Sequence, residues 1–106
     1  MIFKSVDAIP VPAFGTAQRK TLSVGERMMV VEFSLPREGE VPVHHHPYEE
    51  VGYLVSGSLR LRIGAHEDVV QARDSWFIAA GEEHTMSTED GAVFVAIFSP
   101  PRRDYR

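Results

Sequence analysis

Residues 58–63, with the sequence SLRLRI, carry the pattern that decides the fold of this chain. Leu59, Leu61 and Ile63 alternate with serine and arginine, so the apolar side chains project from one side of an extended segment. A period of two is the signature of a half-buried β-strand. The stretch therefore predicts a strand with one face in a core and the other in solvent.

Short apolar runs lie on both sides of this stretch, at residues 27–35, 50–56, 69–71, 75–79 and 92–98. Glycine, proline and acidic residues separate the runs, and we expect Gly57 to turn the chain tightly between residues 50–56 and 58–63. No segment has the 3.6-residue periodicity of an amphipathic helix. Seven or so strands of this length predict an all-β domain that forms a closed barrel or a sandwich.

The composition limits the kinds of partner and location. The 106 residues, 43% of them hydrophobic, are expected to form one domain. A net charge of −4 argues against a nucleic-acid partner, and the lack of cysteine excludes disulfides and thiolate metal sites. No run approaches the ~20 apolar residues of a membrane span. Lys4 and Asp7 interrupt the N-terminal apolar residues, so we expect no signal peptide and a cytoplasmic location.

The first 14 residues differ from the rest of the chain. They hold scattered apolar side chains, and Pro10 and Pro12 discourage a helix. We expect an extended arm over residues 1–14 and a barrel over residues 15–106. Such an arm offers a route to a homodimer by adding a strand to a second subunit.

Side chains that bind metals gather in two stretches and form one candidate ligand set: His44, His46, Glu50 and His84. Alternate positions of an extended segment share a face, so His44 and His46 point together. Glu50 keeps the same parity and Glu49 does not, which favours Glu50 as the ligand. His84 follows three turn signals, as expected if a returning strand brings it opposite.

Three imidazoles and a carboxylate suit a first-row transition metal, and the set does not distinguish Ni, Zn, Fe or Mn. His45 has the opposite parity and is expected to face solvent. His66 lies in a charged turn and is expected to be a solvated surface residue.

Two stretches of the chain resemble the paired motifs of the cupin family. Residues 39–57 contain the pattern G-x4-H-x-H-x3-E-x6-G, and residues 74–84, DSWFIAAGEEH, are similar to the second motif. Ala79 stands where a proline is usual, Arg73 replaces the leading glycine, and Thr88 replaces the closing asparagine. None of these departures removes a ligand.

This resemblance implies a small antiparallel jelly-roll β-barrel, the cupin barrel, over about residues 15–106. It implies a metal at the mouth of the barrel, held by His44, His46, Glu50 and His84. Small cupins of this type are commonly dimers, so a homodimer is expected.

The C-terminal stretch, residues 95–105 with the sequence VAIFSPPRRDY, is similar to the tail of single-domain cupins of the pectin-degradation type. Those proteins linearise unsaturated uronates. The resemblance implies that Phe98 and Arg102 line the substrate pocket, with Arg102 receiving the carboxylate. Met86 shares a face with His84 and is a further candidate for the pocket wall. Ala96 stands where that group has an acid–base Asp, a role that a methyl group cannot fill.

Three functions follow as hypotheses. The leading one is a metal-dependent enzyme with isomerase or lyase chemistry on an unsaturated sugar acid or a related carboxylated small molecule. The second is a non-haem metal dioxygenase. The third is a non-catalytic binding or sensing module that keeps the metal as an anchor for a small molecule, and Ala96 favours it. The residue that performs catalysis is left unassigned. Tyr48, Glu49 and Tyr53 are the conceivable replacements for the missing Asp.

Overall fold

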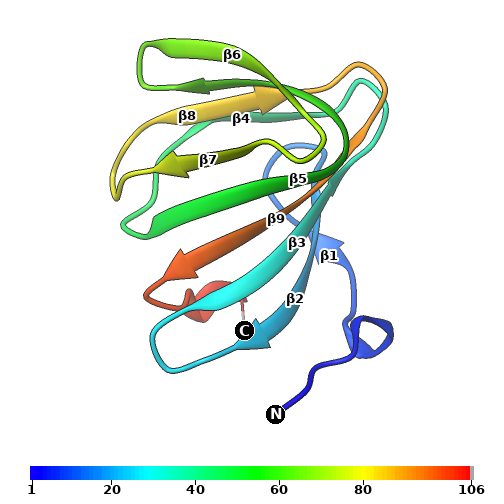
Figure 1. Cartoon of the computed structure of the whole chain (residues 1–106), viewed down its shortest axis with the longest axis vertical. Helices are drawn as coiled ribbons and strands as arrows, with labels where there is room; N and C mark the ends of the chain where they lie inside the picture. The colour runs from blue at the N-terminus through cyan, green and yellow to red at the C-terminus, as the bar shows by residue number, and fades with distance from the viewer. Residues whose placement is uncertain (106) are drawn as a thin grey trace.

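Antiparallel strands make up most of the chain in the computed structural model, which describes residues 1–105 (Figure 1). Two single-turn 3₁₀ helices flank the strands, in the order η1 (Ser5–Asp7), β1 (Val11–Pro12), β2 (Gln18–Val24), β3 (Met29–Leu35), β4 (Glu40–His44), β5 (Glu49–Ile63), β6 (His66–Gln71), β7 (Ser75–Ile78), β8 (His84–Ser87), β9 (Ala92–Ser99) and η2 (Arg103–Tyr105). These described residues contain no α-helix, which confirms the predicted all-β class. None of them forms a helix with the length and apolar character needed to cross a membrane.

Strand β5 is shared between the two sheets of the barrel. Its first half pairs with β9 and β7 in a sheet that continues through β3 and β2 to β1. Its second half pairs with β6 and β8, and β8 pairs in turn with β4. Figure 1 shows the strand curving from one sheet into the other.

Gly57 lies where β5 changes sheets. Its φ is +83°, and a Cβ there would lie 2.2 Å from the carbonyl oxygen of Gly91. Only glycine fits this combination of backbone angle and close approach. The expectation of a tight turn at Gly57 is therefore wrong: the glycine permits a bend within β5, which is 15 residues long and extends on both sides of it.

The core lies between the two sheets and follows from alternation in the sequence. β3 and β9 pair in register over seven positions, and each buries every second residue. Phe33 of β3 stacks on Phe94 of β9 with ring centroids 5.0 Å apart and an interplanar angle of 16°. Both rings line the same cavity as the four candidate ligands.

The N-terminal segment folds against its own chain. β1 pairs with β2, with Val11 opposite Arg19. The loop after β1 is attached to β4, because the Thr16 amide donates to the Glu40 carbonyl oxygen at 3.1 Å and the Glu40 amide donates to the Thr16 hydroxyl at 2.9 Å. This loop places Phe14 beside the mouth of the barrel.

Candidate metal centre

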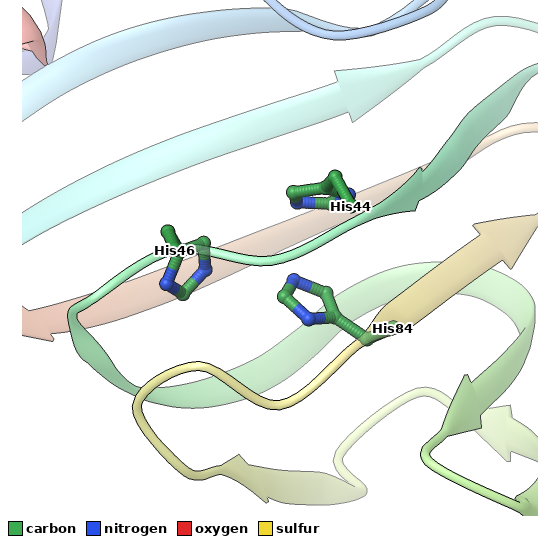
Figure 2. A group of neighbouring side chains, drawn as sticks. All are labelled: His44, His46 and His84. Carbon is green, nitrogen blue, oxygen red and sulfur yellow. The ribbon is translucent and has the colours of Figure 1, made fainter.

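Three histidine rings face a common space at one end of the barrel (Figure 2). His44 ends β4, His46 lies in the loop before β5, and His84 begins β8. His44 and His84 are directly opposite in the β4–β8 pairing, with ring centroids 4.1 Å apart. One ring nitrogen from each histidine lies within 4.8 Å of the other two. Strand β8 thus brings His84 close to His44 and His46, the two histidines that the alternation argument had grouped.

Each of these rings is oriented by a carbonyl two residues away. The Nδ1 atoms of His44, His46 and His84 lie 2.9, 3.0 and 2.8 Å from the carbonyl oxygens of Pro42, Tyr48 and Glu82. A carbonyl oxygen only accepts, so Nδ1 carries the proton and donates in all three cases. The Nε2 atoms are left with lone pairs, the arrangement typical of metal-binding histidines.

Burial favours the neutral form of two of the rings. Desolvation is the largest effect and lowers the pKa of His44 and of His84 below 6.5. The charge of the His46 imidazole lowers both pKa values further, whereas the Glu50 carboxylate raises them. The Pro42 and Glu82 carbonyl oxygens raise the same pKa values, but by less than desolvation lowers them. At neutral pH these two rings are therefore uncharged and able to donate a lone pair.

Glu50 completes the group. It is buried, and its Oε1 lies 3.1 Å from Nε2 of His46. Because Nδ1 of His46 already donates to Tyr48, a neutral His46 would direct a lone pair at the carboxylate. The contact is favourable when a proton, carried by either group, or a metal ion lies between the two atoms.

The group fits a transition-metal ion. The ring nitrogens of the three histidines lie within 4.8 Å of one another, and together with the Glu50 carboxylate they would hold one ion. Nitrogen donors with one carboxylate oxygen match zinc, nickel, iron or manganese, and the geometry does not separate these.

The histidines open into a cavity at this end of the barrel. Phe98, Arg102 and Met86, the three residues predicted to contact a substrate, all line it. Pockets of this kind, mostly apolar with a few placed polar groups, are where proteins bind small molecules.

Arg102 is buried with its charge balanced. Its Nε and Nη2 atoms donate to Asp104 at 3.4 and 3.1 Å, and Cζ lies 3.8 Å from the centre of the Tyr105 ring. The Phe98 and Tyr48 ring centres are each 5.0 Å from Cζ. The Nη1–Nη2 edge of the guanidinium has no partner among residues 1–105, and such an edge can hold a carboxylate through two hydrogen bonds.

A model of the cupin domain matches residues 31–98, which is more than half of the chain and includes all four candidate ligands. This chain belongs to the cupin family. Its fold therefore agrees with the predicted jelly-roll barrel.

Named relatives of this cupin include the pectin degradation protein KdgF of Dickeya dadantii, which is 26% identical over 91 residues, covering 83% of this chain and 82% of the relative. An RmlC-like cupin from Shewanella frigidimarina superposes with a TM-score of 0.92 at 24% identity, over 99% of this chain and 95% of the other. KdgF from Halomonas sp. superposes with a TM-score of 0.90 at 19% identity, over 100% of this chain and 98% of the other. At these identities the two structures show the fold alone.

In this cupin, several residues considered from the sequence lie away from the centre. His45 and His66 are exposed. Glu49 and Tyr53 also face outward. Tyr48 packs its ring on His46, with centroids 5.9 Å apart, but does not line the cavity. None of the three conceivable replacements for the missing Asp therefore reaches the cavity.

Ala96 is fully buried on the inner side of β9, between Gly52 of β5 and Val31 of β3. The position of the missing acid–base Asp is thus filled by a methyl group packed in the core. Its immediate strand neighbours are a glycine and a valine, whose side chains could not donate a hydrogen bond to an Asp at this position.

Sequence reasoning missed Tyr105, which lines the cavity of this cupin. It ends η2, and its amide donates to the Arg102 carbonyl oxygen at 3.2 Å. Side chains three apart eclipse each other in a 3₁₀ turn, which places the Tyr105 ring over the Arg102 guanidinium. Burial raises the pKa of Tyr105, so its hydroxyl stays protonated at neutral pH. The three-residue spacing was visible in the sequence, but the turn was not.

Proposed function

We propose that this chain is a metal-dependent enzyme acting on a small carboxylated molecule, with the ion held by His44, His46, Glu50 and His84. The observation that carries the proposal is the contact between His46 Nε2 and Glu50 Oε1 at 3.1 Å, which a metal ion bound to both atoms would make favourable. Two further imidazoles with lone pairs directed at the same space make a metal ion a better occupant than a proton.

When bound, the ion would act as a Lewis acid that polarises a substrate oxygen. Arg102 would bind the substrate carboxylate with its Nη1–Nη2 edge, while Asp104 holds the opposite edge in place. Phe98 would pack on the carbon skeleton, because its ring lies 5.5 Å from the His46 ring and 5.0 Å from Arg102 Cζ. A molecule on Phe98 can thus reach both polar ends of the cavity.

The pectin degradation relative makes an unsaturated sugar acid the first substrate to assay, with isomerase or lyase chemistry. NMR of the product after incubation with the metal-loaded protein would reveal ring opening. Turnover no faster than that of the free metal would exclude this substrate.

Ala96 favours a second candidate, a binding or sensing module that anchors a small molecule on the metal without converting it. Among the residues described, Glu50 is the one carboxylate that lines the cavity, and the proposed ion would occupy it. Calorimetry beside an activity assay separates the two: tight binding with no product supports the module.

Elemental analysis tests the metal itself. The protein purified without added metal is expected to hold about one transition-metal ion per chain, and His46→Ala is expected to lose it. His66→Ala is the matched control, because His66 is exposed and is not among the residues that line the cavity. Equal metal content in all three proteins would contradict the assigned ligands.

A homodimer is part of the proposal. The outer side of β5 exposes Val51, Tyr53 and Val55, and the neighbouring strands add Phe77 and Ile97 directly beside Val51. A contiguous apolar sheet face of this kind is typical of a surface that a second copy covers. Light scattering is expected to give twice the subunit mass. Val51→Glu is expected to reduce it, whereas Val69→Glu, on the other sheet, is expected to leave it unchanged.

A further inference from the structure

The wall of the cavity is apolar to an unusual degree for a site that would bind a sugar. Outside the four candidate ligands, Arg102 and Tyr105, every described lining residue is apolar. The large ones are Phe14, Phe33, Val41, Met86, Phe94 and Phe98. Within residues 1–105 no serine, threonine, asparagine or glutamine side chain lines the cavity.

The few polar groups are already committed under the proposed function. The imidazoles and Glu50 would hold the ion, and the free edge of Arg102 would hold one carboxylate. Among the side chains of residues 1–105 that line the cavity, Tyr105 is the one left to pair with a substrate hydroxyl. Each further hydroxyl buried against this wall would lose its water without gaining a partner, which weakens binding by roughly 5- to 150-fold.

Aromatic rings surround the space between the two polar ends. Phe33 and Phe94 stack on each other, and Tyr105 meets Phe33 and Phe98 edge-on, with centroids 6.0 and 5.8 Å apart. At the mouth, the ring of Phe14 lies 4.9 Å from that of His44. Aromatic walls of this kind favour a flat ring that stacks or meets them edge to face.

From this wall we infer that the substrate is a flat, hydroxyl-poor carboxylate, with an aromatic or unsaturated body and one oxygen directed at the ion. The inference rests on the proposed function, since it uses the ion and Arg102 as the two polar anchors. It differs from the sugar acid that the pectin relative suggests.

Two probes of matched size test this inference by calorimetry on the Zn²⁺-loaded full-length chain. Both 3-hydroxybenzoate and shikimate are six-membered carbocycles with one carboxylate, but shikimate carries three hydroxyls. We expect 3-hydroxybenzoate to bind at least about 10-fold more tightly, and glucuronate to bind as weakly as shikimate.

A variant of the wall adds a second measurement. Met86→Gln puts a hydrogen-bonding amide of similar size into the cavity. It is expected to reduce the ratio of the dissociation constants of shikimate and 3-hydroxybenzoate several-fold. Met28→Gln is the control, because Met28 is exposed and lies outside the cavity. If Met86→Gln does not fold, the ratio measured on the unaltered protein decides.

The outcomes separate this inference from the proposed function. Shikimate or glucuronate binding as tightly as 3-hydroxybenzoate overturns the inference, and the proposed function then stands if Arg102→Gln weakens both. Failure of every probe to bind the Zn²⁺-loaded chain overturns the inference and the role of Arg102. Failure of the chain to bind Zn²⁺ overturns the proposed function itself.

Discussion

Replacing Gly52 with alanine is expected to disturb the core through a single neighbour. Gly52 lies on β5 opposite Trp76 of β7, and the indole covers the glycine. A Cβ at position 52 would lie 2.1 Å from Cε2 and 2.3 Å from Cζ2 and Nε1 of that ring. Ordinary contacts begin near 3.4 Å, so the ring would have to retreat by about 1.3 Å.

The indole has little room to retreat. Trp76 is buried, and its ring meets Phe94 with centroids 5.5 Å apart. Overpacking of this kind costs about 1–3 kcal/mol. The alanine regains about 0.4–1 kcal/mol by restricting the unfolded chain. We expect a net loss of about 1–2 kcal/mol in the free energy of unfolding and a fall in Tm of roughly 5–15 °C.

A double-mutant cycle with Trp76→Leu tests the cause. Urea unfolding of the four proteins is expected to give a Gly52→Ala cost of less than about 0.5 kcal/mol once the indole is gone. Gly25→Ala is the control, since its Cβ would have its nearest contact at 3.3 Å, with the Met28 carbonyl oxygen. An equal cost of Gly52→Ala in both backgrounds would refute the proposed contact.

Three further predictions concern the metal centre. The metal-free protein is expected to lose stability as pH falls below 6.5, because burial lowers the folded pKa of His84 and His44 and the unfolded chain then binds more protons. Urea unfolding at pH 7.5 and 5.5 should give a smaller loss for His84→Gln, and equal losses would contradict this. Chelation is expected to lower the Tm of the metal-loaded protein, since an ion at 100 times its Kd stabilises by about 2.7 kcal/mol; an unchanged scanning-calorimetry trace would argue against a native-state metal. Arg102→Lys is expected to weaken 3-hydroxybenzoate binding at least about 10-fold, because an ammonium cannot make the two parallel hydrogen bonds; titration calorimetry would show it, with exposed Arg60→Lys unchanged.

Local periodicity was sufficient to predict much of the fold. Alternation at residues 58–63 gave the inner face of β5, and the apolar run at residues 92–98 matches β9. Strands β4 and β8 were harder to predict, because they are short and carry polar residues that face the metal centre. Gly57 was interpreted as a turn because its required backbone angle suits a turn and a bend equally well.

In the site too, local sequence pattern predicted some features and not others. Parity grouped His44 with His46 and chose Glu50, which is buried, over Glu49, which is exposed. The aromatic wall could not be predicted, because Phe14, Phe33 and Tyr105 come together only through the closure of the barrel and the C-terminal turn. Barrel closure and the C-terminal turn bring together residues that are far apart in the sequence, so no local sequence pattern predicts these contacts.

The carbonyl groups that hold the three imidazoles belong to the same short segments as the imidazoles themselves. The hydrogen bonds that orient the three ligands are thus contained within two short stretches of chain and do not involve the other side chains around the cavity. Substituting the other cavity residues can therefore change which small molecule binds, while the hydrogen bonds that orient the metal ligands remain. In a barrel of this kind, substitutions of the cavity-lining residues can change the substrate while metal binding is kept.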